Sequence, residues 1–145
     1  MALHLVKLCV GCDSVEDLQD WVERRLAEMR RNGEAAEQRH TTRMAPKRAE
    51  ELLDGGSLYW VIRGNIQVRQ RLLDIRPFTD GEGTPRCHLV LEPVLVQTAW
   101  QPRRAFQGWR YLPAADAPSD AGAEGGGFAD LPAALGRELA ELGLL

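Results

Sequence analysis

The stretch Ser57–Ile75, SLYWVIRGNIQVRQRLLDI, constrains the fold most, because it reads as two strands joined by a tight turn. Leu58–Ile62 is a short apolar run with aromatic and β-branched residues, which favour strands. Gly64-Asn65 follows, and a leading glycine suits a two-residue turn because it takes positive φ without steric cost. Ile66–Leu72 then alternates apolar and polar residues, as a half-buried strand does. The stretch therefore predicts a β-hairpin.

The expected register of this hairpin gives it one arginine-bearing face. With Gly64-Asn65 as the loop, Trp60 faces Arg69 and Leu58 faces Arg71. A guanidinium over an exposed indole gains about 0.5–1 kcal/mol, and the pair also offers a flat binding surface. In the alternative reading a helix covers Trp60 and Leu58, and the arginines reach past them to water.

Length and composition indicate one globular domain. The chain has 145 residues, of which 44% are hydrophobic and 27% charged. No run approaches the roughly 18 apolar residues of a membrane span, and the N-terminal MALHLVKLCVG is too short and interrupted for a secretory signal. Three cysteines fit reduced thiols better than a disulfide framework. We expect a cytoplasmic protein with no cofactor and no membrane partner.

The charge distribution points to an anionic partner for the middle of the chain. The net charge of −3 argues against a general nucleic-acid binder. Residues 39–110, however, carry 12 Lys+Arg and 7 Asp+Glu, so the middle is basic while the ends are acidic.

The hydropathy pattern predicts an α+β fold. A helix should begin at Asp13 or Ser14 and end at Asn32-Gly33, and a shorter one should follow Pro46 and end at Gly55-Gly56. Strands are predicted outside the hairpin at Leu3–Val10, Arg39–Met44, Arg86–Leu91 and Val94–Trp100. We expect a small, mostly antiparallel, barrel-like sheet with two to three helices.

Three segments follow from these patterns. Residues 1–112 form a single α+β domain, and residues 113–128, rich in Ala, Pro and Gly, form a flexible linker. Residues 129–145 place Leu131, Leu135, Leu139 and Leu142 on one stripe. They predict a C-terminal amphipathic helix that docks on the core or on a protein partner.

Two clusters of basic residues suit anion binding. Arg43, Lys47 and Arg48 crowd the start of the short helix, where a bound phosphate or carboxylate would offset the unfavourable positive charge. The segment Gln101–Tyr111, QPRRAFQGWRY, interleaves arginines with aromatics, which suits stacking on bases or clamping phosphates. The alternatives are side chains splayed into water in the first cluster and a loop packed over the sheet in the second.

The predicted ligand-binding set combines these clusters with the hairpin face. Its members share a cationic or indole side chain expected at the surface. They are Arg43, Lys47, Arg48, Trp60, Arg69, Arg71, Arg103, Arg104, Trp109 and Arg110.

Cys9-Val-Gly-Cys12 lies between a predicted strand and a predicted helix, the place of a thioredoxin-like redox motif. The same pair could join Cys87 and His88 in a zinc site, although neighbours on a strand point to opposite faces. Buried, inert thiols are the default reading. No hydrolase, metalloprotease or phosphate-loop motif occurs, so the sequence leaves catalysis open.

Four segments together resemble an uncharacterised family of small proteins, a domain of unknown function common in alphaproteobacteria. They are HLVKLCVG (His4–Gly11), RMAPKRAEELLDGGSLYWVIRG (Arg43–Gly64), IQVRQRLLDI (Ile66–Ile75) and QPRRAFQGWRYL (Gln101–Leu112). The family carries no established activity, so this resemblance implies no site residues.

A looser similarity is to PUA-like domains, including ASCH and EVE domains. There a helix leads into a Gly-initiated strand pair, as in GGSLYWVIRG here. This similarity implies a small barrel whose groove binds RNA or modified nucleotides. We therefore expect a binding domain for RNA or a nucleotide-like anion. The alternatives are a protein-interaction module that uses the C-terminal helix and a small enzyme acting on a nucleotide or acidic metabolite.

Overall fold

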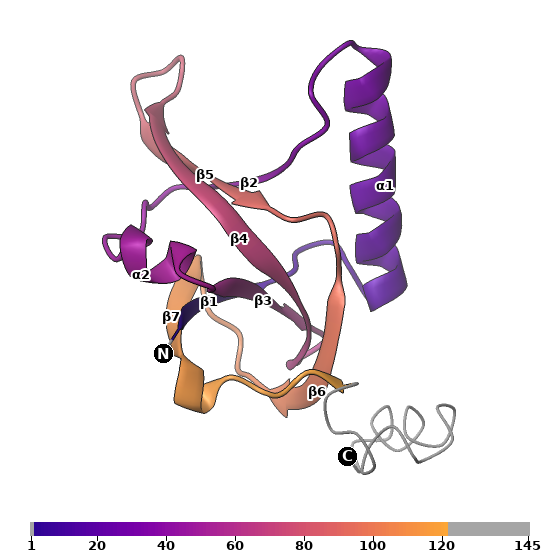
Figure 1. Ribbon diagram of the computed structural model, residues 1–145, viewed down its shortest axis with the longest axis vertical. Coiled ribbons are helices and arrows are strands. Elements are labelled where there is room, and N and C mark those ends of the chain that lie inside the picture. Colours follow the sequence, from indigo (N-terminus) through magenta and orange to yellow (C-terminus); the bar gives the residue numbers. More distant parts are fainter. Residues whose placement is uncertain (1, 122–145) are drawn as a thin grey trace.

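The computed structural model describes residues 2–121, which form one mixed sheet with two α-helices (Figure 1). The predicted C-terminal helix and residues 122–128 of the predicted linker lie outside the described residues. The elements in chain order are β1 (Leu3–Leu8), α1 (Val15–Arg31), β2 (Gln38–Thr42), α2 (Ala49–Leu53), β3 (Ser57–Ile62), β4 (Asn65–Thr79), β5 (Pro85–Leu91), β6 (Val96–Pro102), β7 (Trp109–Pro113) and a 3-10 turn (Ala114–Asp116).

The sheet is open, so the expected barrel-like closure is corrected. Its strand order is β2-β5-β4-β3-β1-β7, and β6 pairs with β4 outside this order. Within the described chain no pairing joins the end strands β2 and β7. The pairings are antiparallel except for β1 with β3, which run parallel because α1, β2 and α2 lie between them in the chain.

The long strand β4 changes partners along its 15 residues. Its first half pairs with β3 on one side and β6 on the other, and its second half pairs with β5. The change falls next to a bulge between Leu72 and Asp74. Because a bulge bends and twists its strand, β4 can serve both halves of the sheet.

The predicted hairpin is present, but its turn lies one residue earlier than expected. Ile62 pairs with Asn65, so the two-residue loop is Arg63-Gly64, with φ angles of 50° and 82°. Two positive φ angles suit a tight hairpin turn whose twist matches the strands, and glycine alone takes one without strain. Asn65 is therefore the first residue of β4 rather than part of the turn.

The expected pairing of tryptophan with arginine is corrected as well. A register shift between Trp60 and Val61 places Trp60 opposite Val68, while Arg69 lies opposite Tyr59. A one-residue slip moves side chains to the other face of a sheet. The arginine-bearing face predicted beside Trp60 is therefore not formed.

The core lies on both faces of β3, whose residues are all buried. On one face Leu58, Trp60 and Ile62 pack with the apolar stripes of α1 and α2. On the other, Tyr59 and Val61 pack in a smaller cluster with β1, β4 and β7. β3 thus lies between the two hydrophobic clusters of the core.

Helix α1 confirms the prediction from its sequence. Ser14 is the N-cap, and its Oγ accepts a hydrogen bond from the Asp17 amide at 3.1 Å. The buried residues Leu18, Val22, Leu26 and Met29 form the expected stripe. No helix within residues 2–121 is long and apolar enough to cross a membrane.

Gly56 lies where the backbones of α2 and β1 approach each other closely. A Cβ at this position would overlap the carbonyl oxygens of Leu3 and Leu52. We expect Gly56→Ala to lower the free energy of unfolding by about 3 kcal/mol, because backbone atoms cannot move aside cheaply. Urea denaturation followed by tryptophan fluorescence measures the change.

Gly81→Ala is the matched control, because a Cβ there meets open space at an ordinary φ. It should leave the midpoint of unfolding almost unchanged. Equal midpoints for both variants would contradict the described packing of Gly56.

Candidate functional site

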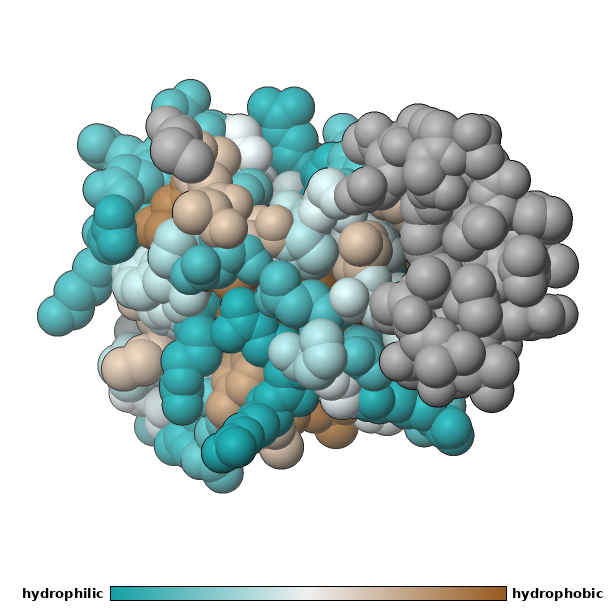
Figure 2. Space-filling view, turned by 90° about the horizontal axis from the view of Figure 1, so that it is seen from below, coloured by the Kyte–Doolittle hydropathy of each residue, from teal (hydrophilic) through white to brown (hydrophobic). Residues whose placement is uncertain are grey.

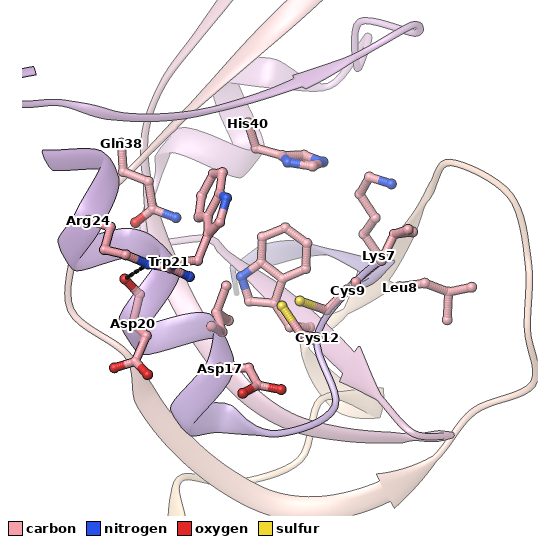
Figure 3. A pocket seen from close by; sticks show the side chains of 14 residues that line it. Lys7, Leu8, Cys9, Cys12, Asp17, Asp20, Trp21, Arg24, Gln38 and His40 are labelled. Carbon is pink, nitrogen blue, oxygen red and sulfur yellow. Dashed lines mark hydrogen bonds between the residues drawn. The ribbon is translucent and has the colours of Figure 1, made fainter. Parts of the chain in front are cut away.

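A pocket of about 530 Å³ opens between α1, the end of β1 and β2 (Figure 3). Its walls come from three regions that are distant in sequence. The lining residues used below are Lys7, Cys9, Cys12, Trp21, Gln38, His40 and Trp60, with Asp17, Asp20 and Arg24 along α1. Its volume lies in the range of small-molecule sites, roughly 300–1,000 Å³.

The turn from β1 into α1 shapes one end of the pocket. Gly11 takes φ of 87°, a conformation that L side chains rarely adopt. The Asp13 amide donates to the Asp17 carboxylate at 2.9 Å, which fixes the start of α1. The loop therefore brings the Cys9 and Cys12 thiols beside the first turns of the helix (Figure 3).

Two indole rings give the pocket apolar walls. Trp60 is only 3% exposed, and its Nε1 donates to the buried Gln70 Oε1 at 2.9 Å. Gln38 of β2 also donates to Gln70 Oε1, at 3.1 Å. Trp21 on α1 is 42% exposed, so one wall is rigid and buried while the other lies at the mouth.

Lys7 supplies a cation inside the pocket. It lies next to the buried Val6 on β1, so it points to the opposite face, toward α1. Within residues 2–121 no carboxylate lies within ion-pair distance of its ammonium. Burial lowers the pKa of Lys7, because desolvation disfavours the charged form.

His40 supplies a neutral polar group beside this cation. Its ring packs edge-on against Trp60, with centroids 5.1 Å apart. Burial lowers the pKa of His40 to about 4, and the Lys7 ammonium adds to the shift. The Nε2 atom is buried and has no hydrogen-bond partner among the described residues. The imidazole is therefore neutral at pH 7, and its Nε2 is left without a hydrogen-bond partner in the described chain.

The Cys9 thiol is protonated rather than reactive. Burial raises the pKa of Cys9, and the adjacent Cys12 thiol raises it further. The zinc alternative does not assemble, because Cys87 is fully buried in the core and no group of three metal-binding side chains occurs in the part of the chain described. A raised thiol pKa disfavours thiolate chemistry, so the structure gives the redox alternative no support.

The predicted arginines fall in several places rather than in one groove. Arg103, Arg104 and Arg110 meet in a separate hollow beside Phe106. Arg69 is bound by Asp120 through two contacts of 2.7 Å. Arg43 and Arg71 are exposed at the surface. Of the predicted set only Trp60 lines the α1 pocket.

Lys47, Arg48 and Trp109 lie together beside Tyr111. The Tyr111 hydroxyl accepts hydrogen bonds from the backbone amides of Lys47 at 2.9 Å and Arg48 at 3.2 Å. Arg48 also pairs with Glu51. The Glu51 carboxylate therefore pairs with one of the cations expected to bind an external anion, Arg48, while the Lys47 side chain is exposed.

Sequence reasoning missed Lys7, Trp21, Gln38 and His40 as pocket residues. One signal was available: Lys7 interrupts the apolar strand LHLVKL at a position that should face the core. Trp21 carries no signal that separates a pocket wall from ordinary helix surface, and β2 is too polar for its inward positions to be recognised from alternation alone.

The low pKa of His40 makes stability depend on pH. The pKa of His40 is 6.5 in the unfolded chain and about 4 in the folded chain. Between these values the unfolded chain binds a proton that the folded chain does not, so the free energy of unfolding falls as the pH is lowered. On going from pH 7 to pH 5, we expect the wild type to lose about 2 kcal/mol more unfolding free energy than the His40→Gln variant does. Urea titrations at each pH measure it.

Between pH 7 and pH 8 the same difference should change by only about 0.2 kcal/mol, which is the internal control, because His40 is mostly neutral in both states there. A difference that changes as little from pH 7 to pH 5 would show that His40 is not held neutral in the fold.

Comparison with known proteins adds a family assignment. No curated protein and no solved structure matches the chain. A family model described as "Protein of unknown function (DUF1489)" matches residues 5–145, which is nearly the whole chain. The chain therefore belongs to the DUF1489 family.

Proposed function

We propose that the protein binds a small anion carrying a flat conjugated ring, such as a nucleotide, in the pocket beneath α1. The observation that carries this proposal is the Lys7 ammonium, which is half-buried and has no carboxylate partner among the described residues. A cation held away from water is costly unless a counter-charge reaches it. An anionic ligand supplies that charge.

The aromatic walls support a ring as the second part of the ligand. Trp60 is held by its hydrogen bond to Gln70, and Trp21 lies on the opposite element of the pocket. Indoles stack on flat rings and on bases, with about 1–3 kcal/mol gained per stacked base. A rigid inner wall with a more exposed outer wall suits a ring that enters from the mouth.

The neutral imidazole supports recognition of the ring edge. His40 Nε2 is unpartnered in the described chain and lies beside the Lys7 cation. Figure 3 shows the Lys7 and His40 side chains on the same side of the pocket. A ligand that places its anionic group on Lys7 can therefore hydrogen-bond His40 through a nearby ring or sugar atom. All three cysteines are free thiols, which favours the cytoplasm, the compartment where nucleotides abound.

Lys7→Met tests the role of the cation. We expect it to weaken binding of ribonucleoside 5′-monophosphates about tenfold or more, the typical worth of a charge-assisted contact. Isothermal titration and quenching of tryptophan fluorescence measure the affinity. The same variant should be at least as stable as wild type in urea, because it removes a desolvated charge.

Lys47→Met is the matched control, since Lys47 is the other lysine of the chain and is exposed outside the pocket. It should bind the nucleotides as the wild type does. If neither lysine variant changes the affinity, or if nucleosides without phosphate bind equally well, the anion pocket is refuted.

A further inference from the structure

We infer that a second site, the arginine hollow, binds the sugar-phosphate backbone of single-stranded RNA. The hollow has a volume of about 600 Å³ and lies where β1, β6 and β7 meet. It is lined chiefly by Gln101, Arg103, Arg104, Phe106 and Arg110. In Figure 2 the described part of the molecule, seen from below, is largely hydrophilic with small apolar patches between the polar side chains.

The three arginines of the hollow carry charge that the described chain does not neutralise. Seven ion pairs occur within residues 2–121, and none involves Arg103, Arg104 or Arg110. By contrast, Arg69 on the neighbouring β4 is neutralised by Asp120. Guanidinium groups bind phosphate through two parallel hydrogen bonds, so unpaired arginines around one hollow suit phosphodiesters.

Local contacts hold the backbone of Arg103 and the guanidinium of Arg110 in place. The Arg103 amide donates to the Gly64 carbonyl at 2.8 Å, which ties the β6–β7 loop to the hairpin turn. The Arg110 guanidinium lies over the Phe106 ring, 5.4 Å from its centroid, and donates to the Gln107 carbonyl at 3.3 Å. A preorganised guanidinium plane loses less entropy on binding and can stack on an RNA base.

Gln101 supplies the feature that favours RNA over DNA. Its Nε2 donates to the Asp116 carbonyl at 3.0 Å, which identifies Oε1 as the remaining acceptor. Oε1 is buried and receives no hydrogen bond from the described residues, a costly state. Because Gln101 lines the hollow, a hydroxyl bound there can supply the missing donor once the side chain turns its Oε1 toward it. The ribose 2′-OH is such a group beside every phosphate of RNA, and DNA lacks it.

The arginine hollow and the α1 pocket are independent sites. Val6 lines the hollow and Lys7 lines the pocket, and these neighbours on β1 point to opposite faces of the sheet. The proposal for RNA therefore does not rest on the proposed nucleotide function. Each can fail without the other.

The test uses the full chain and a short, fluorescein-labelled single-stranded RNA, with fluorescence anisotropy at several salt concentrations. We expect the double variant Arg103→Gln/Arg104→Gln to bind at least about tenfold more weakly. The slope of log affinity against log salt should become shallower by about 1.4, since each single-strand phosphate contact contributes roughly 0.7.

Arg30→Gln/Arg31→Gln is the matched control. It removes the same charge from two exposed, adjacent arginines at the C-terminal end of α1, away from β6 and β7 (Figure 1). It should bind RNA as the wild type does. If this control loses as much affinity as the hollow variant, the binding is non-specific attraction and the site is refuted.

Gln101→Leu tests the sugar contact. Wild type should prefer the RNA to a DNA strand of the same sequence, and this variant should bind both with the lower affinity of DNA. Equal affinity of the wild type for RNA and DNA would overturn the assignment of the 2′-OH. RNA affinity that is the same in wild type and the hollow variant would overturn the site itself.

Discussion

The side chain of Gln70 is the point on which the packing of the sheet depends. It is fully buried on β4, and its amide meets three other segments. Oε1 accepts from Trp60 Nε1 of β3 and from Gln38 Nε2 of β2, while Nε2 donates to the Glu92 carbonyl after β5. Every polar atom of the group is satisfied, which makes a buried network specific rather than costly. Gln70 also lies where the pairing partner of β4 changes from β3 to β5, so its hydrogen bonds join the two halves of the sheet. The same hydrogen bonds hold Trp60 in place as a wall of the α1 pocket.

Around this satisfied centre, two buried side-chain atoms of the described residues lack a hydrogen-bond partner, His40 Nε2 and Gln101 Oε1. His40 lines the α1 pocket together with Lys7, and Gln101 lines the arginine hollow. Unpaired buried polar groups lower stability, so their presence beside cavities is the physical basis of both binding proposals. The two sites lie on opposite faces of β1, with the buried strand β3 beside it as the rigid support for both.

Elements whose signals are local were predictable from the sequence. The predicted start of α1 at Asp13 or Ser14 and its end at Asn32-Gly33 are confirmed, and the structure identifies Ser14 as the N-cap. The hairpin was predicted correctly as an element, but its turn and register were not. A choice between Arg63-Gly64 and Gly64-Asn65 depends on twist and on the bulge beside Trp60, which neighbouring strands impose. β7 was missed as a strand, because its partner β1 lies about a hundred residues earlier in the chain.

The sequence by itself determined the α+β class, the helix α1, the central hairpin and the basic character of residues 39–110, since propensity, capping and composition act over a few residues. Only the tertiary structure decided that the sheet is open and which cations keep their charge unpaired. Arg69 pairs with Asp120 from far along the chain, whereas Lys7 shares its pocket with His40 and two indoles and has no ion-pair partner in the described residues. Pairing of a charge depends on contacts between distant segments, so no pattern in a single sequence reveals it.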